Sequence, residues 1–213
     1  LVLADAVATH VDLHGPPDVL LVSTMVDVAA LLGLTRTALD DVAVVHYVHE
    51  SQLLYPPADG RTLDRGAALR GWSNLVAADH VVFSSRHHRD ALRSALPGFL
   101  RSFPDERQDH MVDAVLAESS VLPVGIDLQE LDSSRGVDEA DGGPPILLWN
   151  HRWEHDKQPE VLASAVEQLD DRGVPFRLAL AGERPTDPPE AFERLRLRLG
   201  DRLLAYGTLE RAE

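Results

Sequence analysis

Cysteine is absent from the 213-residue chain. The protein therefore cannot form disulfides or thiolate metal sites, which is compatible with a reducing compartment, and we expect a cytoplasmic protein. No apolar run approaches the roughly 20 residues that a membrane-spanning helix needs. The opening residues LVLADAVATH lack the basic and apolar regions of a signal peptide. Because the sequence begins with Leu1 rather than methionine, we expect a fragment or a trimmed chain.

Positive charge is scarce in this sequence. It has 20 Lys and Arg residues against 35 Asp and Glu residues, which gives a formal net charge of −15. This balance excludes a general electrostatic attraction to nucleic acid, so any such contact must use a local basic patch. The one local concentration comprises Arg86, Arg89, Arg93 and Arg101. It fits a contact with a phosphate backbone, and it also fits an ordinary solvated helix face.

Short β-branched runs alternate with helical patterns along the chain. This alternation indicates the α/β class, with parallel sheets and helical crossovers. We predict strands at 18–23, 42–48, 80–85, 119–127, 146–149, 176–182 and 202–207. We predict helices at 25–34, 63–78, 86–95, 104–118, 158–172 and 189–199. The wholly apolar strand at 146–149 is expected to be buried.

A change in composition divides the chain. Residues 128–145 are acidic, small and rich in glycine and proline, which is typical of a linker or an exposed excursion. We therefore predict an N-terminal domain over 1–130, a linker over 131–144 and a second domain over 145–213. The sequence stops where a further helix and strand would be expected, so we expect the second domain to be incomplete.

Two cationic residues, Arg152 and Lys157, follow the predicted strand at 146–149 and precede a predicted helix. Helix N-termini favour anions, and an arginine fork can add paired bonds to phosphate oxygens. Together the two side chains could neutralise a diphosphate leaving group as its charge develops. The alternative is a surface turn in which Arg152 pairs with Glu154 or Asp156.

His49 and Glu50 end an otherwise apolar strand. A polar pair at the carboxyl end of a parallel strand suits contact with a sugar hydroxyl or proton transfer near neutral pH. The alternative is a structural histidine with satisfied hydrogen bonds. The histidines of this region could also suggest zinc, but their spacing matches no metal motif, so we expect no metal.

Trp72 stands beside Ser73 and Asn74 in the predicted helix at 63–78. An aromatic ring next to small polar groups suits stacking on a base or a sugar. Burial of Trp72 in the core is the alternative.

Several segments together resemble a known family. VLPVGID, NHRWEHDKQPE, LAGERP and LLAYGTL resemble parts of retaining glycosyltransferases of the GT-B fold, which has two Rossmann-like parallel-sheet domains. HYVHESQLLYP, RGWSNLVAADHVVFSSRHHRDAL, LPGFLRSFPD and LLWNHRWEHDKQPE resemble the tRNA-queuosine α-mannosyltransferase family. The chain departs from the family pattern at Ser51, Ser84 and His87. A glycine-rich loop before Leu1 and a glutamate motif after Glu213 would complete that pattern, so we expect this fragment to be inactive alone.

The resemblance implies a role for each candidate residue. Arg152 and Lys157 would bind the diphosphate of a nucleotide sugar, GDP-mannose, without a metal or other cofactor. His49 would lie near the transferred sugar with Glu50 beside it, as the catalytic pair. A cyclopentenediol hydroxyl of queuosine in tRNA would attack from the front face, so the α configuration would be retained. The candidates for the acceptor side are Tyr55, Trp72, Asn74, His88 and Arg89.

Two other functions remain open at this point. The first is a GT-B glycosyltransferase that acts on a lipid or small-molecule acceptor, which the acidic balance favours. The second is a nucleotide-binding module without catalysis.

Overall fold

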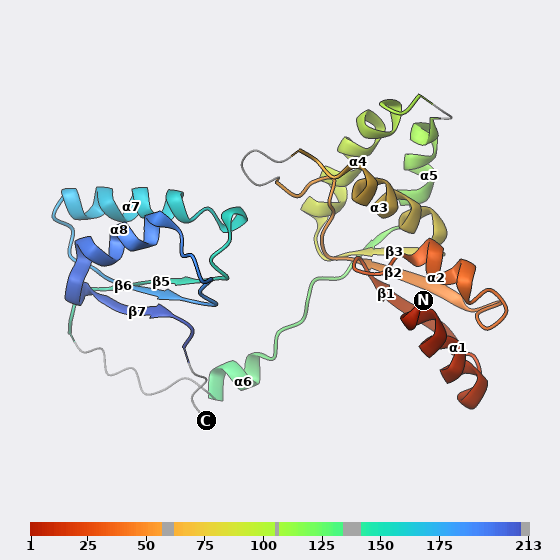
Figure 1. Cartoon of the computed structure of the whole chain (residues 1–213), viewed down its shortest axis with the longest axis horizontal. Helices are drawn as coiled ribbons and strands as arrows, with labels where there is room; N and C mark the ends of the chain where they lie inside the picture. Colours follow the sequence, from red (N-terminus) through yellow and green to blue (C-terminus); the bar gives the residue numbers. More distant parts are fainter. Residues whose placement is uncertain (57–61, 105–106, 134–141, 210–213) are drawn as a thin grey trace. The chain divides into compact units, whose positions relative to one another are not determined.

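The structure, a computed structural model, describes residues 1–56, 62–104, 107–133 and 142–209. The chain divides into two compact units, the N-terminal unit Leu1–Asp127 and the C-terminal unit Leu128–Glu213. Each unit contains a parallel β-sheet with helices packed on it (Figure 1). In the described part of the chain, no helix is both long and apolar enough to cross a membrane.

The N-terminal unit is built on a parallel sheet in the strand order β1-β2-β3-β4. Its elements are α1 (Val2–His14), β1 (Val19–Ser23), α2 (Val28–Leu34), β2 (Ala43–Val48), α3 (Arg65–Ala77), β3 (His80–Phe83), α4 (Arg86–Arg101), the 3₁₀ helix η1 (Gln108–Met111), α5 (Val112–Ala117) and β4 (Ser120–Val121). The pairing of Ser23 with Tyr47 and of Val48 with Phe83 brings the carboxyl ends of β1, β2 and β3 to one edge.

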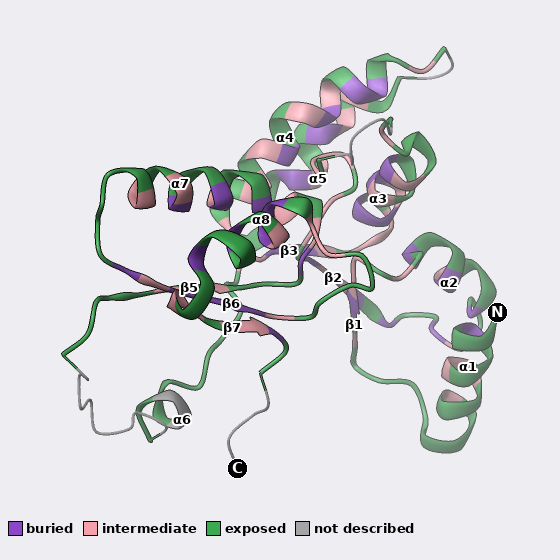
Figure 2. Ribbon diagram, turned by 60° about the vertical axis from the view of Figure 1, so that its left-hand side comes forward, coloured by how far each residue is buried: buried purple, intermediate pink, exposed green. Residues whose placement is uncertain are grey.

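Helices α3, α4 and α5 pack on this sheet through a shared core (Figure 2). Trp72 and Phe83 are among its largest fully buried side chains. Side-chain caps fix where the helices begin, because Asp27, Asp64 and Ser85 each accept a hydrogen bond from the backbone N–H three residues ahead. The polar residues that follow each strand are thereby held at the sheet edge.

Helix α4 is longer than predicted. The prediction ended it at residue 95, ahead of Pro97, but the helix continues to Arg101. A proline inside a helix removes one hydrogen bond and kinks or breaks the helix in isolation. Here Leu92, Leu96 and Phe99 lie on one buried face, and the burial of that face offsets the cost of the proline.

Other boundaries also differ from the prediction. Helix α1 was not predicted, and β4 is far shorter than the predicted strand at 119–127. The predicted helix at 104–118 is present only from Gln108 onward, as η1 and α5, and residues 105–106 lie outside the described residues. Helix α6 (Leu128–Ser133) occupies the start of the predicted linker, of which residues 134–141 lie outside the described part.

The C-terminal unit has a smaller parallel sheet in the order β5-β6-β7. After α6, its elements are β5 (Ile146–Asn150), η2 (His155–Lys157), α7 (Pro159–Asp171), β6 (Arg177–Ala181), α8 (Glu190–Leu199), η3 (Gly200–Arg202) and β7 (Leu203–Gly207). Ion pairs of Arg198 with Asp170 and of Arg194 with Glu160 connect α8 to α7. The core beneath these helices includes Phe192, which is fully buried.

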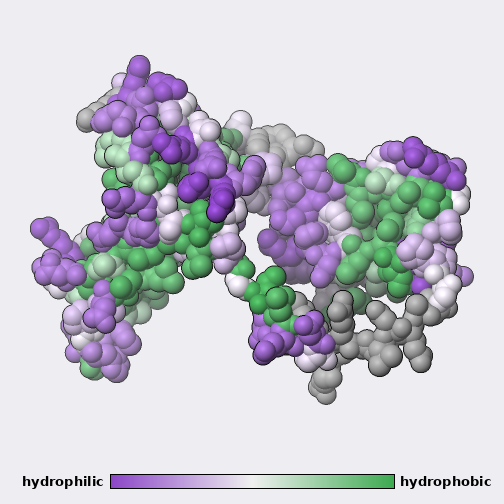
Figure 3. Space-filling model, turned by 180° about the vertical axis from the view of Figure 1, so that it is seen from behind, coloured by the Kyte–Doolittle hydropathy of each residue, from purple (hydrophilic) through white to green (hydrophobic). Residues whose placement is uncertain are grey.

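Strand β5 is buried on one face only, which corrects the prediction of a buried strand. Leu147 and Trp149 pack against the core, whereas Ile146 and Leu148 are 51% and 65% exposed. The reason is that α7 and α8 lie on the same side of the sheet (Figure 1). Hydrophobic side chains accordingly remain on the molecular surface (Figure 3).

A close approach of two strand ends depends on Gly182. This residue has a φ of +125°, and a Cβ placed on it would lie 1.9 Å from the carbonyl oxygen of His151. We predict that Gly182→Ala lowers the free energy of unfolding of the C-terminal unit by more than about 2 kcal/mol. Urea denaturation followed by tryptophan fluorescence measures the change.

Gly173→Ala is the matched control for this prediction. Gly173 also has a positive φ, +66°, but no atom lies within 4 Å of its added Cβ. The free energy of unfolding of Gly173→Ala should therefore fall by only about 1 kcal/mol, which is the cost of placing alanine in a left-handed backbone conformation. Equal losses in the two variants would show that the approach to His151 does not constrain the fold.

Candidate functional site

A cationic turn lies at the carboxyl end of β5. Arg152 Nη1 is 2.9 Å from Glu154 Oε1, and Lys157 Nζ is 2.6 Å from Asp156 Oδ2. The Arg152–Glu154 pair is the one expected for an ordinary surface turn. Its two side chains are 61% and 41% exposed, and pairs of this kind contribute about 0–1 kcal/mol. Replacing the glutamate by another anion therefore costs little.

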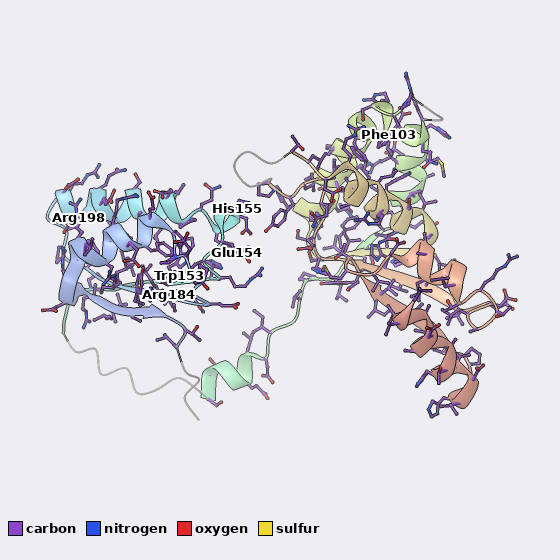
Figure 4. The ribbon with its side chains drawn as sticks, viewed as in Figure 1. Phe103, Trp153, Glu154, His155, Arg184 and Arg198 are labelled. Carbon is purple, nitrogen blue, oxygen red and sulfur yellow. The ribbon has the colours of Figure 1, made fainter. Side chains whose placement is uncertain are left out.

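Trp153 anchors this turn in the core. The residue is 4% exposed, and its ring meets Phe192 and Tyr206 edge to face, with centroids 4.8 and 4.7 Å apart. Its backbone N–H also donates to the carbonyl of Glu183 at 3.3 Å. Figure 4 shows that Trp153 points inward while Glu154 and His155 lie at the end of the unit. The residues on either side of Trp153 are thereby positioned without being buried.

Helix α7 begins at Pro159, and Gln158 alone separates it from Lys157. Gln158 adopts a left-handed conformation with a φ of 59°, and Pro159 occupies the first turn of the helix. A proline at this position fixes the start of a helix, because its missing N–H would have no intrahelical partner. The side chain of the N-cap residue, Gln158, makes no capping hydrogen bond, so the N–H groups of this N-terminus add to the positive potential around the turn.

Arg184 adds a third cation to this edge, and sequence reasoning missed it. Its guanidinium carbon lies 5.0 Å from the centre of the Tyr206 ring, and Nη2 is 3.8 Å from Glu193. Figure 4 shows Arg184 next to Trp153. The segment GERP after the predicted strand at 176–182 was the available signal, because it follows the strand that pairs with β5.

The N-terminal unit gathers polar residues at its own strand ends. Thr24, which follows β1, places Oγ1 2.8 Å from His49 Nδ1, which follows β2. His88 lies in the first turn of α4, and its ring meets Phe83 edge to face at 5.6 Å. His88 Nε2 is buried and has no hydrogen-bond partner among the described residues. The structure thus brings His49 and His88 to one edge of the sheet.

His46 also belongs to this group, although sequence reasoning gave it no role. Burial lowers the pKa of the His46 imidazole from its ordinary value of 6.5. A hydrogen bond with the backbone of Val22 acts against this shift, and the neighbouring His49 acts with it. Burial likewise lowers the pKa of His88, and the nearby His49 acts in the same direction. Both rings are therefore neutral at physiological pH.

A cavity of about 300 Å³ opens between the ends of β1 and β2 and helix α3. Trp72 and Asn74 line it, but both are buried and bonded within the fold. Trp72 Nε1 donates to Gln108, while Asn74 accepts from Val28 N and donates to the carbonyl of Val26, both at 2.8 Å. These two acceptor-side candidates therefore shape the wall of the cavity.

The remaining acceptor-side candidates lie outside this wall. Tyr55 is half-buried in the turn that follows Ser51, to whose carbonyl its N–H donates at 2.9 Å. Arg89 pairs with Asp90 at 3.0 Å. Two other arginines of the predicted basic patch also have acidic partners: Arg93 pairs with Asp113 at 2.8 Å, and Arg101 pairs with Asp109 at 3.1 Å. Neighbouring acids thus neutralise much of the patch.

A metal centre was not predicted. Within residues 1–56, 62–104, 107–133 and 142–209, no three His, Asp or Glu side chains are grouped so that they could hold a metal ion.

Comparison with known proteins shows what this chain is similar to. A family model described as "tRNA-queuosine alpha-mannosyltransferase N-terminal" matches residues 1–126. A curated relative from Drosophila melanogaster, named tRNA-queuosine alpha-mannosyltransferase, is 32% identical over 201 residues. The match covers 92% of this chain and 53% of the relative, so the chain spans about half of the relative's length.

Two solved structures resemble the fold. Sucrose-phosphate synthase from Thermosynechococcus elongatus has a TM-score of 0.62 at 17% identity, over 98% of this chain and 49% of that one. A trehalose-6-phosphate synthase has a TM-score of 0.54 at 12% identity, over 99% of this chain and 51% of that one. Both have the GT-B fold, and the predicted GT-B class with two parallel sheets is confirmed.

The lowered pKa values of His46 and His88 predict a pH dependence of stability. Below the ordinary value of 6.5 the unfolded chain binds a proton that the folded rings resist, so the free energy of unfolding falls as the pH falls. Urea midpoints measured from pH 7.5 to 5.5 should therefore decrease, and His46→Leu should make this decrease shallower. An identical slope in this variant would contradict the assignment.

Proposed function

Because the chain belongs to the tRNA-queuosine α-mannosyltransferase family, we propose that it serves the transfer of mannose from GDP-mannose to queuosine in a tRNA anticodon. The proposed reaction retains the α configuration. The observation that carries the proposal is the cationic turn of Arg152 and Lys157 at the carboxyl end of β5, directly before α7. Ligands of open parallel sheets bind beyond the carboxyl ends of the strands.

The role proposed for this turn is to bind the donor diphosphate. Arg152 exchanges its weak pair with Glu154 for phosphate oxygens, and Lys157 and the first amides of α7 add positive charge. As the bond between mannose and the diphosphate breaks, negative charge grows on the departing GDP. Side chains placed in advance stabilise that charge more than they stabilise the intact donor, which lowers the barrier.

The catalytic role is proposed for His49 and Glu50, at the end of β2. The hydroxyl of Thr24 lies within hydrogen-bond distance of both ring nitrogens of His49, 2.8 Å from Nδ1 and 3.3 Å from Nε2, and restrains the ring. A histidine held in this way can contact the hydroxyls of the transferred mannose, while Glu50 offers a carboxylate beside it. A hydroxyl of the queuosine cyclopentenediol then attacks on the face from which GDP leaves.

The acceptor is proposed to contact the N-terminal unit. Trp72 and Asn74 line the cavity of this unit, and a direct contact with the acceptor is proposed for Tyr55, His88 and Arg89. A lipid or small-molecule acceptor is the second candidate. The ion pairs of Arg89, Arg93 and Arg101 favour it, because they reduce the positive charge that a tRNA backbone would meet. A nucleotide-binding module without catalysis is the third candidate.

One experiment separates these candidates. The complete gene product that carries this chain is incubated with labelled GDP-mannose and total tRNA, from cells with or without queuosine. Label in the tRNA only when queuosine is present supports the proposal. Donor turnover without labelled tRNA favours the second candidate, and nucleotide binding without turnover favours the third.

We predict that Lys157→Ala and Arg152→Ala each weaken GDP binding to the chain by roughly tenfold or more, since charge-assisted hydrogen bonds contribute about 1.5–3 kcal/mol. Isothermal titration calorimetry measures the affinity. Arg172→Ala is the matched control, because Arg172 is an exposed cation at the other end of α7. GDP affinity that is unchanged in both test variants would refute a diphosphate role for the turn.

Glu154→Gln provides a further test of the same turn. It removes the carboxylate that pairs with Arg152, so it should leave GDP affinity unchanged or increase it. A tenfold loss in this variant would indicate that the pair is a structural feature and not an exchangeable one.

The tRNA contact yields a separate prediction for the exposed face of α4. Changing Arg86, Arg89 and Arg93 to glutamate should weaken tRNA binding and lower the steepness of its salt dependence. For a single strand the loss is about 0.7 in the slope of log affinity against log salt for each phosphate contact removed. Gel shifts at several salt concentrations measure this slope. Affinity and slope that do not change would exclude this face as the tRNA contact.

A further inference from the structure

Arg184 follows the carboxyl end of β6, and packing fixes its place beside the cationic turn. Its guanidinium carbon lies 5.0 Å from the centre of the Tyr206 ring. That ring meets Trp153, the residue after Arg152, with centroids 4.7 Å apart. The backbone N–H of Trp153 also donates to the carbonyl of Glu183 at 3.3 Å. Contacts of side chains and of the backbone therefore both hold the segment of Arg184 against the turn (Figure 4).

The acidic partner of Arg184 leaves its donors available. Nη2 is 3.8 Å from Glu193 Oε1, which is longer than a hydrogen bond. The same carboxylate accepts hydrogen bonds from the Tyr206 hydroxyl at 2.7 Å and from Arg196 Nε at 2.9 Å. Because the side chain of Arg184 is 47% exposed, a ligand in solvent reaches its N–H groups.

The cationic turn needs further positive charge to match a diphosphate. Arg152 pairs with Glu154 at 2.9 Å, and Lys157 pairs with Asp156 at 2.6 Å. The side chain of Asp156 is only 6% exposed, so its carboxylate remains beside Lys157 when a ligand binds. A departing nucleoside diphosphate carries about three negative charges, since the terminal phosphate alone carries about two near neutral pH. Arg184 is a neighbouring cation that can supply the missing charge.

The form of the arginine side chain suits this ligand. A guanidinium is a planar fork that bonds phosphate oxygens in pairs, and its donors point outward in the plane of the group. Packing over the ring of Tyr206 restricts the rotation of Arg184, so less freedom is lost when phosphate binds. The contact with the ring therefore prepares the side chain for an anion at the sheet edge.

We propose that Arg184 is a further donor-binding residue, which contacts the diphosphate together with Arg152 and Lys157. This assignment rests on the proposed function, in which the ligand is the diphosphate of the nucleotide sugar. Guanine is the other part of the donor that an arginine can recognise, since its edge presents two acceptors. The diphosphate is favoured because Trp153 and Tyr206 connect Arg184 to the turn that carries the other two cations.

The test is calorimetry on the complete gene product that carries this chain, with GDP and inorganic pyrophosphate as separate probes. Arg184→Ala should weaken the binding of both probes by the same factor, roughly tenfold, as expected for the loss of a charge-assisted hydrogen bond. A loss with GDP but not with pyrophosphate would show that Arg184 contacts the base or the ribose. Either that result or unchanged affinity for both probes would overturn the assignment.

Two further variants control for charge and for folding. Arg184→Lys keeps the charge but not the fork, so it should retain part of the affinity. Arg202→Ala is the matched control, because Arg202 lies over the ring of Phe176 at 5.5 Å, before the other end of β6, and is 40% exposed. It should bind both probes as wild type does. An equal loss in Arg202→Ala would mean that the effect is not specific to Arg184, and would contradict the proposal.

The outcomes distinguish this assignment from the proposed function. If Arg152→Ala weakens GDP binding and the complete gene product transfers mannose to tRNA, but Arg184→Ala binds both probes normally, the function stands and the assignment is wrong. If Arg184→Ala loses affinity for both probes but the wild type transfers no mannose to tRNA, the assignment stands and the function is wrong.

Discussion

Parallel pairing of the strands is the constraint on which the placement of the polar residues depends. Because neighbouring strands run in one direction, the residues that follow β1, β2 and β3 share one edge of the first sheet, and those that follow β5 and β6 share one edge of the second. Thr24 meets His49 for this reason, although 25 positions separate them in the sequence. Arg152 and Arg184 share an edge in the same way.

Rigid anchoring and weak ion pairing are combined at the cationic turn. Trp153 is held by Phe192 and Tyr206, so the backbone on either side of it has a fixed position. The cation Arg152 nevertheless pairs with Glu154, whose side chain is 41% exposed. Such a turn can exchange one anion for another with little change in the backbone, which is the property that a site for a leaving diphosphate requires.

The sequence predicted most of the fold because its signals are local. Apolar runs such as that at 42–48 and the caps at Asp64 and Ser85 depend on neighbours in the chain. The wrong predictions concern features that contacts between distant residues determine. Examples are the extension of α4 past Pro97 and the exposure of Leu148.

The same distinction applies to the site. The motif around Arg152 and Lys157 could be read from the sequence. The burial of His46 and the hydrogen bond that Asn74 accepts from the backbone of Val28 could not. A histidine within an apolar strand has the same sequence pattern whether its ring is buried or not. Only the packing of α3 over the strand ends decides between these cases, and that packing joins residues far apart in the chain.

The most direct test of the central claim is a map of backbone amide shifts on titration with GDP. We expect the largest shifts on residues 150–160, with a smaller response at Arg184. The strands of the N-terminal unit should respond little to GDP alone. Shifts that are absent from 150–160, or that are confined to the N-terminal unit, would contradict the claim that this turn binds the diphosphate.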